Sequence, residues 1–255
     1  MDKATYTRVI TALCLVACVG PIYMYVPMVF LGLIYLAGYG MTYEAVAMSY
    51  SNKTGYFCGF FVLIGAYVGY LYYTYMALFV FLSWLGRVLV MFSAWQPKRL
   101  KEALLLLGCI DVSLFTISFH KLYIADIWLL LFVMIAVSGI DSIAYFVGKR
   151  FGQHRIVPKI SPNKTLEGYL GAAVWLLLLE GIFMIDNDIR ILMLTMIFCM
   201  VYILAITGDL LVSFQKRILH VKDTGRFLPG HGGLLDRFDS WMFVVPFVCL
   251  IASIN

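Results

Sequence analysis

Acidic side chains stand inside apolar segments in the C-terminal half of the chain, where burying a carboxylate is costly. Asp141 lies in DSIAYFVGKRFG, Asp209 in TGDLLVSFQKR, and Asp236 and Asp239 in LLDRFD. Carboxylates from separate helices that meet at one level could hold Mg²⁺ through one or two oxygens while phosphate groups complete its coordination. The pattern therefore predicts metal-assisted phosphate chemistry, although Asp141 alone is equally well explained as the structural partner of a nearby cation.

A hydroxyl and a cation accompany Asp209 at helical spacing. Ser213 follows four residues later, and Lys216 or Arg217 follows a turn after that, so one helix face would present all three groups in succession. Further cations lie in two basic loops, at residues 149–165 and 213–237. The candidates for phosphate contacts are Lys164, Lys216, Arg217, Lys222 and Arg237. The first loop alone is equally well explained by membrane orientation and contact with anionic lipid headgroups.

Glycines gather just before the last apolar segment, in LPGHGGLLDRFD. Glycine lets backbone N–H groups approach a phosphate closely, and the start of a helix adds partial positive charge. We therefore predict a phosphate cradle that includes Gly232. His231 either donates a hydrogen bond to phosphate or only shapes the turn. A glycine-rich turn also caps helices, so it points to phosphate only together with the neighbouring acids and cations.

Elements that position these residues must lie in lipid, because 63% of the 255 residues are hydrophobic and only 13% are charged. A spanning helix needs about 20 mostly apolar residues. We predict an all-α polytopic integral membrane protein with about nine transmembrane helices. The predicted spans run near residues 7–26, 28–49, 55–73, 75–94, 102–119, 124–148, 166–185, 190–212 and 238–254.

Basic residues are concentrated in the connections that share one side of the membrane with the N-terminus. The positive-inside rule therefore predicts a cytoplasmic N-terminus and a site that faces the cytoplasm, in a cell inner membrane. Orientation explains the net charge of +5, so nucleic-acid binding is not expected. The six cysteines have no paired CxxC spacing and are interpreted as buried apolar residues.

A specific family resemblance is carried by residues 213–239, SFQKRILHVKDTGRFLPGHGGLLDRFD. This segment resembles the signature of the phosphatidate cytidylyltransferase (CDP-diacylglycerol synthase) family. DSIAYFVGKRFG and ISPNKTLEG resemble the family as well, so the likeness covers at least residues 141–240. One departure is Val212, where many relatives have a glutamate before the serine.

The resemblance implies transfer of a cytidylyl group from CTP to phosphatidic acid, giving CDP-diacylglycerol and pyrophosphate. It implies Mg²⁺ dependence, with K⁺ as an optional second cation, and metal ligands at Asp209 and Asp236, with Asp141 and Asp239 adding metal or neighbouring contacts. The residues it assigns to catalysis are Asp209, Asp236, Ser213, Arg217 and Lys222. The residues that we assign to substrate binding are Lys164, Lys216, Asp223, His231, Gly232 and Arg237. No general base is required, because a phosphate monoester is already largely ionised at neutral pH.

Residues 1–100 are expected to form a transmembrane scaffold and residues 101–255 a catalytic region with both basic loops. The N-terminal part carries no comparable motif, so it would supply support, homodimer contacts or a groove for membrane lipids. Glu44, Asp111 and Glu180 are isolated acids to which we assign no role.

Two other interpretations remain open at this point. A CTP-dependent lipid kinase, or a cytidylyltransferase for a different lipid phosphate, would share the nucleotide and the membrane. A transporter could use the buried carboxylates as an ion path, although such sites usually lie near mid-bilayer within repeats. We find no duplicated half in the sequence.

Overall fold

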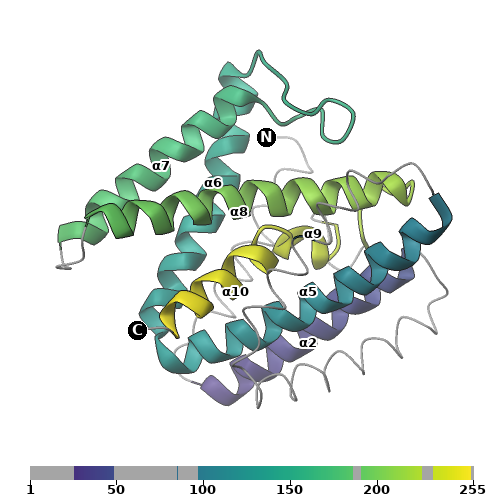
Figure 1. Cartoon of the computed structure of the whole chain (residues 1–255), viewed down its shortest axis with the longest axis horizontal. Coiled ribbons are helices and arrows are strands. Elements are labelled where there is room, and N and C mark those ends of the chain that lie inside the picture. The colour runs from purple at the N-terminus through teal and green to yellow at the C-terminus, as the bar shows by residue number, and fades with distance from the viewer. Residues whose placement is uncertain (1–25, 49–84, 86–96, 186–190, 226–231, 254–255) are drawn as a thin grey trace.

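All the secondary-structure elements in the described part of the chain are helices. The structure is a computed structural model, and it describes residues 26–48, 85, 97–185, 191–225 and 232–253 (Figure 1). The helices are α2 (Pro27–Ala47), α5 (Pro97–Ala125), α6 (Ile127–Phe151), α7 (Leu166–Ile185), α8 (Ile191–Ile218), α9 (Leu235–Phe238) and α10 (Trp241–Ala252). In the described residues, β-structure is limited to one isolated bridge between Arg155 and Thr165.

Four of the described helices are long and apolar enough to cross a membrane. These stretches are Met28–Ala47, Leu107–Ala125, Ile127–Phe151 and Leu194–Ile218. Large apolar side chains also point outward, including Trp128 at 73% exposure and Leu177 at 63%, as expected for surfaces that face lipid. The prediction of an all-helical integral membrane protein is confirmed at this level. The spans predicted near 7–26, 55–73 and 75–94 lie outside the described residues, so the predicted count of nine stays a prediction.

One predicted span differs from the structure. The segment predicted as a single helix near 238–254 is divided into α9 and the 12-residue α10. Between them the Ser240 N–H donates to the Asp239 side chain at 2.8 Å. At about 1.5 Å per residue, α10 covers about 18 Å, less than the roughly 30 Å of a bilayer core.

The core is built around α5, which packs against α2 and α10. Phe115 and Phe119 of α5 are at most 1% exposed, and Met41 of α2 and Val244 of α10 are fully buried. Figure 1 shows α2 and α5 running side by side, with α10 alongside α5. This arrangement brings the N-terminal helix α2 close to the C-terminal segment that contains α9.

A second unit of packing is the pair α6 and α7, which sets the position of the first basic loop. Asp126 begins α6 by accepting the Leu129 N–H at 2.9 Å, and Thr165 begins α7 by accepting the Gly168 N–H at 3.2 Å. A side chain at Gly168 would collide with the Ala144 carbonyl, so the two helices approach closely there. The close packing of α6 and α7 therefore fixes the positions of the two ends of the loop that connects them.

Candidate active site

A polar cavity of about 280 Å³ lies where α6, α7, α8 and the α9 segment meet. Its charged lining residues are Asp141, Lys164, Asp209, Asp236, Arg237 and Asp239. Tyr169, Thr165 and Asn163 line it as well. Six residues that the sequence predicted for the site, drawn from four separate segments, thus surround one cavity.

Asp209 pairs with a cation from the other basic loop. Lys164 Nζ lies 2.5 Å from Asp209 Oδ2, and the two side chains are only 14% and 27% exposed. The Ser213 hydroxyl, one turn further along α8, donates to Asp209 Oδ1 at 3.3 Å. The predicted succession of carboxylate and hydroxyl on one helix face is therefore confirmed.

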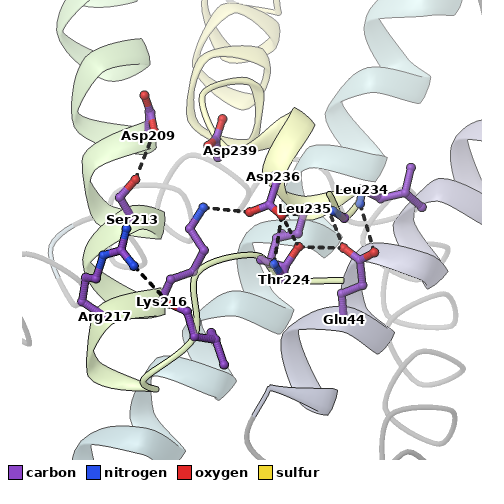
Figure 2. A network of polar contacts seen from close by, with 12 residues as sticks. Glu44, Asp209, Ser213, Lys216, Arg217, Thr224, Leu234, Leu235, Asp236 and Asp239 are labelled. Carbon is purple, nitrogen blue, oxygen red and sulfur yellow. Dashed lines mark hydrogen bonds and ion pairs between the residues drawn. The ribbon is translucent and has the colours of Figure 1, made fainter. Parts of the chain in front are cut away.

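Asp236 is held by four hydrogen bonds. Lys216 Nζ donates to Oδ1 at 2.7 Å, while Oδ2 accepts the Thr224 N–H at 2.9 Å, the Gly233 N–H at 3.0 Å and the Thr224 hydroxyl at 3.1 Å. Figure 2 shows Lys216 reaching from α8 to this carboxylate. Burial alone would raise the pKa of Asp236, but the hydrogen bond and charge of Lys216 and the backbone N–H groups outweigh it. The pKa of Asp236 therefore lies below its usual range.

The glycine turn is shaped around Asp236. Gly232 has a φ of 82°, which side-chain-bearing residues rarely adopt. A Cβ at this position would lie 2.9 Å from Asp236 Oδ2. In this structure the Gly233 N–H binds Asp236 and not an open anion site, so the turn first orients the carboxylate. His231 lies outside the described residues.

The remaining two acids are linked through Ser240. The Ser240 hydroxyl donates to Asp141 Oδ1 at 3.4 Å, and its N–H donates to Asp239. Asp141 is exposed along the cavity, whereas Asp239 is buried. Acids from α6, α8 and the α9 segment therefore approach the same space, as the sequence predicted.

Ser213, Lys216 and Gly232 lie behind the cavity lining, next to Asp209 or Asp236, whereas three further predicted residues lie away from it. Arg217 is exposed, and its guanidinium donates to the Ile160 carbonyl at 2.9 Å and to the Val221 carbonyl at 3.5 Å. It thus ties the first basic loop to the end of α8. Lys222 and Asp223 are exposed on the segment that follows.

Sequence reasoning missed Glu44, which lies on α2 and is only 5% exposed. Its carboxylate accepts the Thr224 hydroxyl and the N–H groups of Leu234 and Leu235 (Figure 2). The one available signal was the cost of an acid inside an apolar span. That signal does not identify a partner about 190 residues away in the chain.

The carboxylates at the cavity could bind Mg²⁺ only if substrate phosphates supplied some of its ligands. Among the described residues, no three acidic, histidine or cysteine side chains are grouped closely enough to hold a metal ion by themselves. Mg²⁺ in nucleotide sites commonly uses one or two carboxylates and takes its other ligands from phosphates and water. Asp209, Asp236, Asp141 and Asp239 all border the same cavity, so any two of them would satisfy that smaller requirement.

Comparison with known proteins gives consistent matches. The cytidylyltransferase family model matches residues 6–254. A phosphatidate cytidylyltransferase from Bacillus subtilis (strain 168) is 42% identical over 125 residues, which are 48% of this chain and 46% of that protein. Similar proteins of the same name from Staphylococcus haemolyticus (strain JCSC1435) and Staphylococcus aureus (strain COL) are 41% and 40% identical over 124 residues, 48% of each chain. The chain thus spans about half the length of the curated relatives it matches.

Proposed function

The chain belongs to the cytidylyltransferase family, and on that premise we propose that it transfers a cytidylyl group from CTP to phosphatidic acid. The products are CDP-diacylglycerol and pyrophosphate. The observation that carries the proposal is the cavity where acids and cations from four segments of a membrane protein converge. Relatives named phosphatidate cytidylyltransferase support the choice of nucleotide and lipid.

The reaction joins two phosphates. An oxygen of the phosphatidic acid monoester attacks the α-phosphorus of CTP, a new P–O bond forms, and the bond to the β-phosphate bridging oxygen breaks as pyrophosphate leaves. The attacking oxygen is already largely ionised at neutral pH, so no side chain has to remove a proton. The task of the protein is to align two anions and to stabilise the charge that develops between them.

The charges around the cavity favour a bound cation in this proposal. Four carboxylates and the cations Lys164, Lys216 and Arg237 border or contact the cavity, which leaves a formal excess of negative charge. Two polyanionic substrates would be repelled by such a cavity. When bound, Mg²⁺ neutralises the phosphates and stabilises the leaving pyrophosphate, and K⁺ is a further candidate cation.

The side chains have separable roles in this proposal. Asp209 and Asp236 are the main candidates to hold Mg²⁺, with Asp141 and Asp239 as additional or supporting ligands. Lys164 and Arg237 border the cavity. Lys164 can turn from Asp209 to a substrate phosphate, and Arg237 is a second candidate for a phosphate contact. Ser213 orients Asp209, and Lys216 orients Asp236.

Placement in the membrane follows from the same charges. We propose that the cavity faces the cytoplasm of the inner membrane, because the basic loops lie around it. CTP reaches the cavity from water, while phosphatidic acid keeps its acyl chains in the bilayer. Residues 1–100 would then act as a scaffold for the catalytic residues 101–255.

The deciding experiment uses the purified full chain in detergent with CTP, phosphatidic acid and Mg²⁺. We expect pyrophosphate release that depends on the lipid and stops when the metal is chelated. CTP labelled in its base should leave the label in extractable lipid. Label that enters lipid only from the terminal phosphate of CTP would instead identify a kinase, and no lipid label from either position would contradict both.

A further inference from the structure

Glu44 is a buried acid far from the predicted motifs, yet it contacts the segment that carries Asp236. It lies on α2, and its Oε1 accepts the Leu234 N–H at 3.0 Å. Its Oε2 accepts the Leu235 N–H at 2.9 Å and the Thr224 hydroxyl at 3.0 Å. Both oxygens of this carboxylate are therefore engaged by the loop and the start of α9.

Thr224 joins Glu44 to Asp236. Its hydroxyl oxygen lies 3.0 Å from Glu44 Oε2 and 3.1 Å from Asp236 Oδ2, and its N–H donates to Asp236 as well. A hydroxyl has one proton, so it can donate to only one of the two carboxylates at a time. Figure 2 shows that these contacts link Glu44 on α2 to Thr224, Thr224 to Asp236, and Asp236 to Lys216 on α8.

The backbone of the loop is fitted to the Glu44 side chain. A Cβ at Gly225 would lie 2.5 Å from Glu44 Oε1, and one at Gly233 would also collide with the Glu44 carboxylate. The loop therefore approaches the carboxylate on two sides with residues that have no side chain. This steric fit accompanies the hydrogen bonds of the neighbouring residues Thr224 and Leu234 to the same carboxylate.

We propose that Glu44 is a positioning residue, whose carboxylate fixes Thr224 and the backbone at Leu234 and Leu235 and so holds Asp236 in place at the cavity. Its catalytic consequence rests on the proposed function. The N-terminal helix α2 thereby contributes directly to the geometry of the site.

The Glu44→Gln substitution distinguishes a positioning role from a packing role. Glutamine keeps the shape of glutamate, but its amide has one acceptor oxygen and a donor NH₂ group. The NH₂ group would face a backbone N–H or the Thr224 hydroxyl, so at least one buried donor loses its acceptor. Glu180 offers a matched control, because it is also 5% exposed and accepts a threonine hydroxyl, from Thr195 at 2.5 Å.

The test compares Glu44→Gln, Thr224→Val, Thr224→Ser and Glu180→Gln in the purified full chain. We expect Glu44→Gln to lower kcat for lipid-linked cytidine by about 10–100-fold with a smaller change in KM for CTP, as for other residues that orient a ligand. Thr224→Val should give a similar loss and Thr224→Ser should restore activity. The double variant Glu44→Gln with Thr224→Val should lose little beyond the worse single variant, because both break one series of contacts.

Hydrogen exchange supplies a readout that does not depend on activity. In Glu44→Gln, exchange in a peptide covering residues 232–240 should become about tenfold faster, while a peptide from α6 keeps its rate. If the wild type transfers no cytidylyl group, the proposed function fails and this exchange measurement still decides the role of Glu44.

Three results would overturn the role of Glu44. The first is unchanged exchange in residues 232–240 of Glu44→Gln. The second is a loss of kcat in Glu180→Gln as large as in Glu44→Gln. The third is equal activity of Thr224→Val and Thr224→Ser. This result can be obtained even if Glu44→Gln fails to fold.

Discussion

Individual residues at the site are defined by their partners more than by their positions in the sequence. Asp209 and Asp236 could be selected from the sequence because an acid in an apolar segment is costly. Their partners Lys164 and Thr224 could not be assigned, since Lys164 comes from another loop and Thr224 lies 12 residues before Asp236. The Gly233 N–H, by contrast, lies only three residues before Asp236. Sequence patterns identify which groups need partners, whereas packing decides which partners they receive.

Stability should depend on pH through Asp236. Its pKa is lower in the folded protein than its usual value of about 3.9, so its ionised form stabilises the fold. That contribution is complete above about pH 5 and is lost as the pH falls through the lowered pKa. We expect the difference in Tm between wild type and Asp236→Asn in detergent to be constant from about pH 8 to 5 and to shrink below about pH 4.

Asp223→Asn is the control for this measurement, because Asp223 is exposed and lies outside the cavity lining. Its melting curve should follow the wild type at each pH. A difference between wild type and Asp236→Asn that persists unchanged at low pH would contradict the role assigned to the Asp236 charge.

At the scale of elements, the apolar pattern predicted the presence of the described helices better than it predicted their ends. The predicted span 166–185 coincides with α7, because Thr165 provides a cap at its start. By contrast, α8 extends to Ile218, beyond the predicted end at residue 212. Its last turns carry polar residues that bond to other segments, such as Lys216, and hydropathy does not register these contacts.

Loss of the cap at Thr165 should weaken α7 and the adjacent wall of the cavity. Thr165→Val keeps the shape but removes the acceptor for the Gly168 N–H, a change that costs about 1 kcal/mol. We expect Tm to fall by about 2–4 °C in scanning fluorimetry, whereas Thr165→Ser should keep most of the wild-type value. Equal Tm values for the valine and serine variants would exclude a capping role.

For the whole molecule, the sequence predicted a helical membrane protein and the convergence of its acids, but not how its two halves meet. Glu44 and Leu234 are 190 residues apart in the chain and in contact in the fold. No local pattern encodes such a contact. Conversely, the two basic loops were expected on one side, and the bond from Arg217 to the Ile160 carbonyl joins them.

Membrane orientation can be tested at two exposed positions. Lys159 lies in the first basic loop, which follows α6, and Ala125 is the last residue of α5, just before α6 begins. We expect a membrane-impermeant maleimide to label Lys159→Cys in inverted vesicles and Ala125→Cys in intact spheroplasts, above the wild-type background. The reverse pattern of labelling would place the cavity on the outer side and contradict the proposed access of CTP.

The most direct test of the central claim uses CTP labelled in its base and phosphatidic acid. It measures the rate at which the label appears in lipid with the wild type, Asp209→Asn and Glu180→Gln. If carboxylates from separate helices organise this transfer, Asp209→Asn should be at least about a hundredfold slower than wild type. Glu180→Gln should stay within about twofold, because Glu180 lies outside the cavity. Lipid-linked cytidine formed by Asp209→Asn at the wild-type rate would contradict the account.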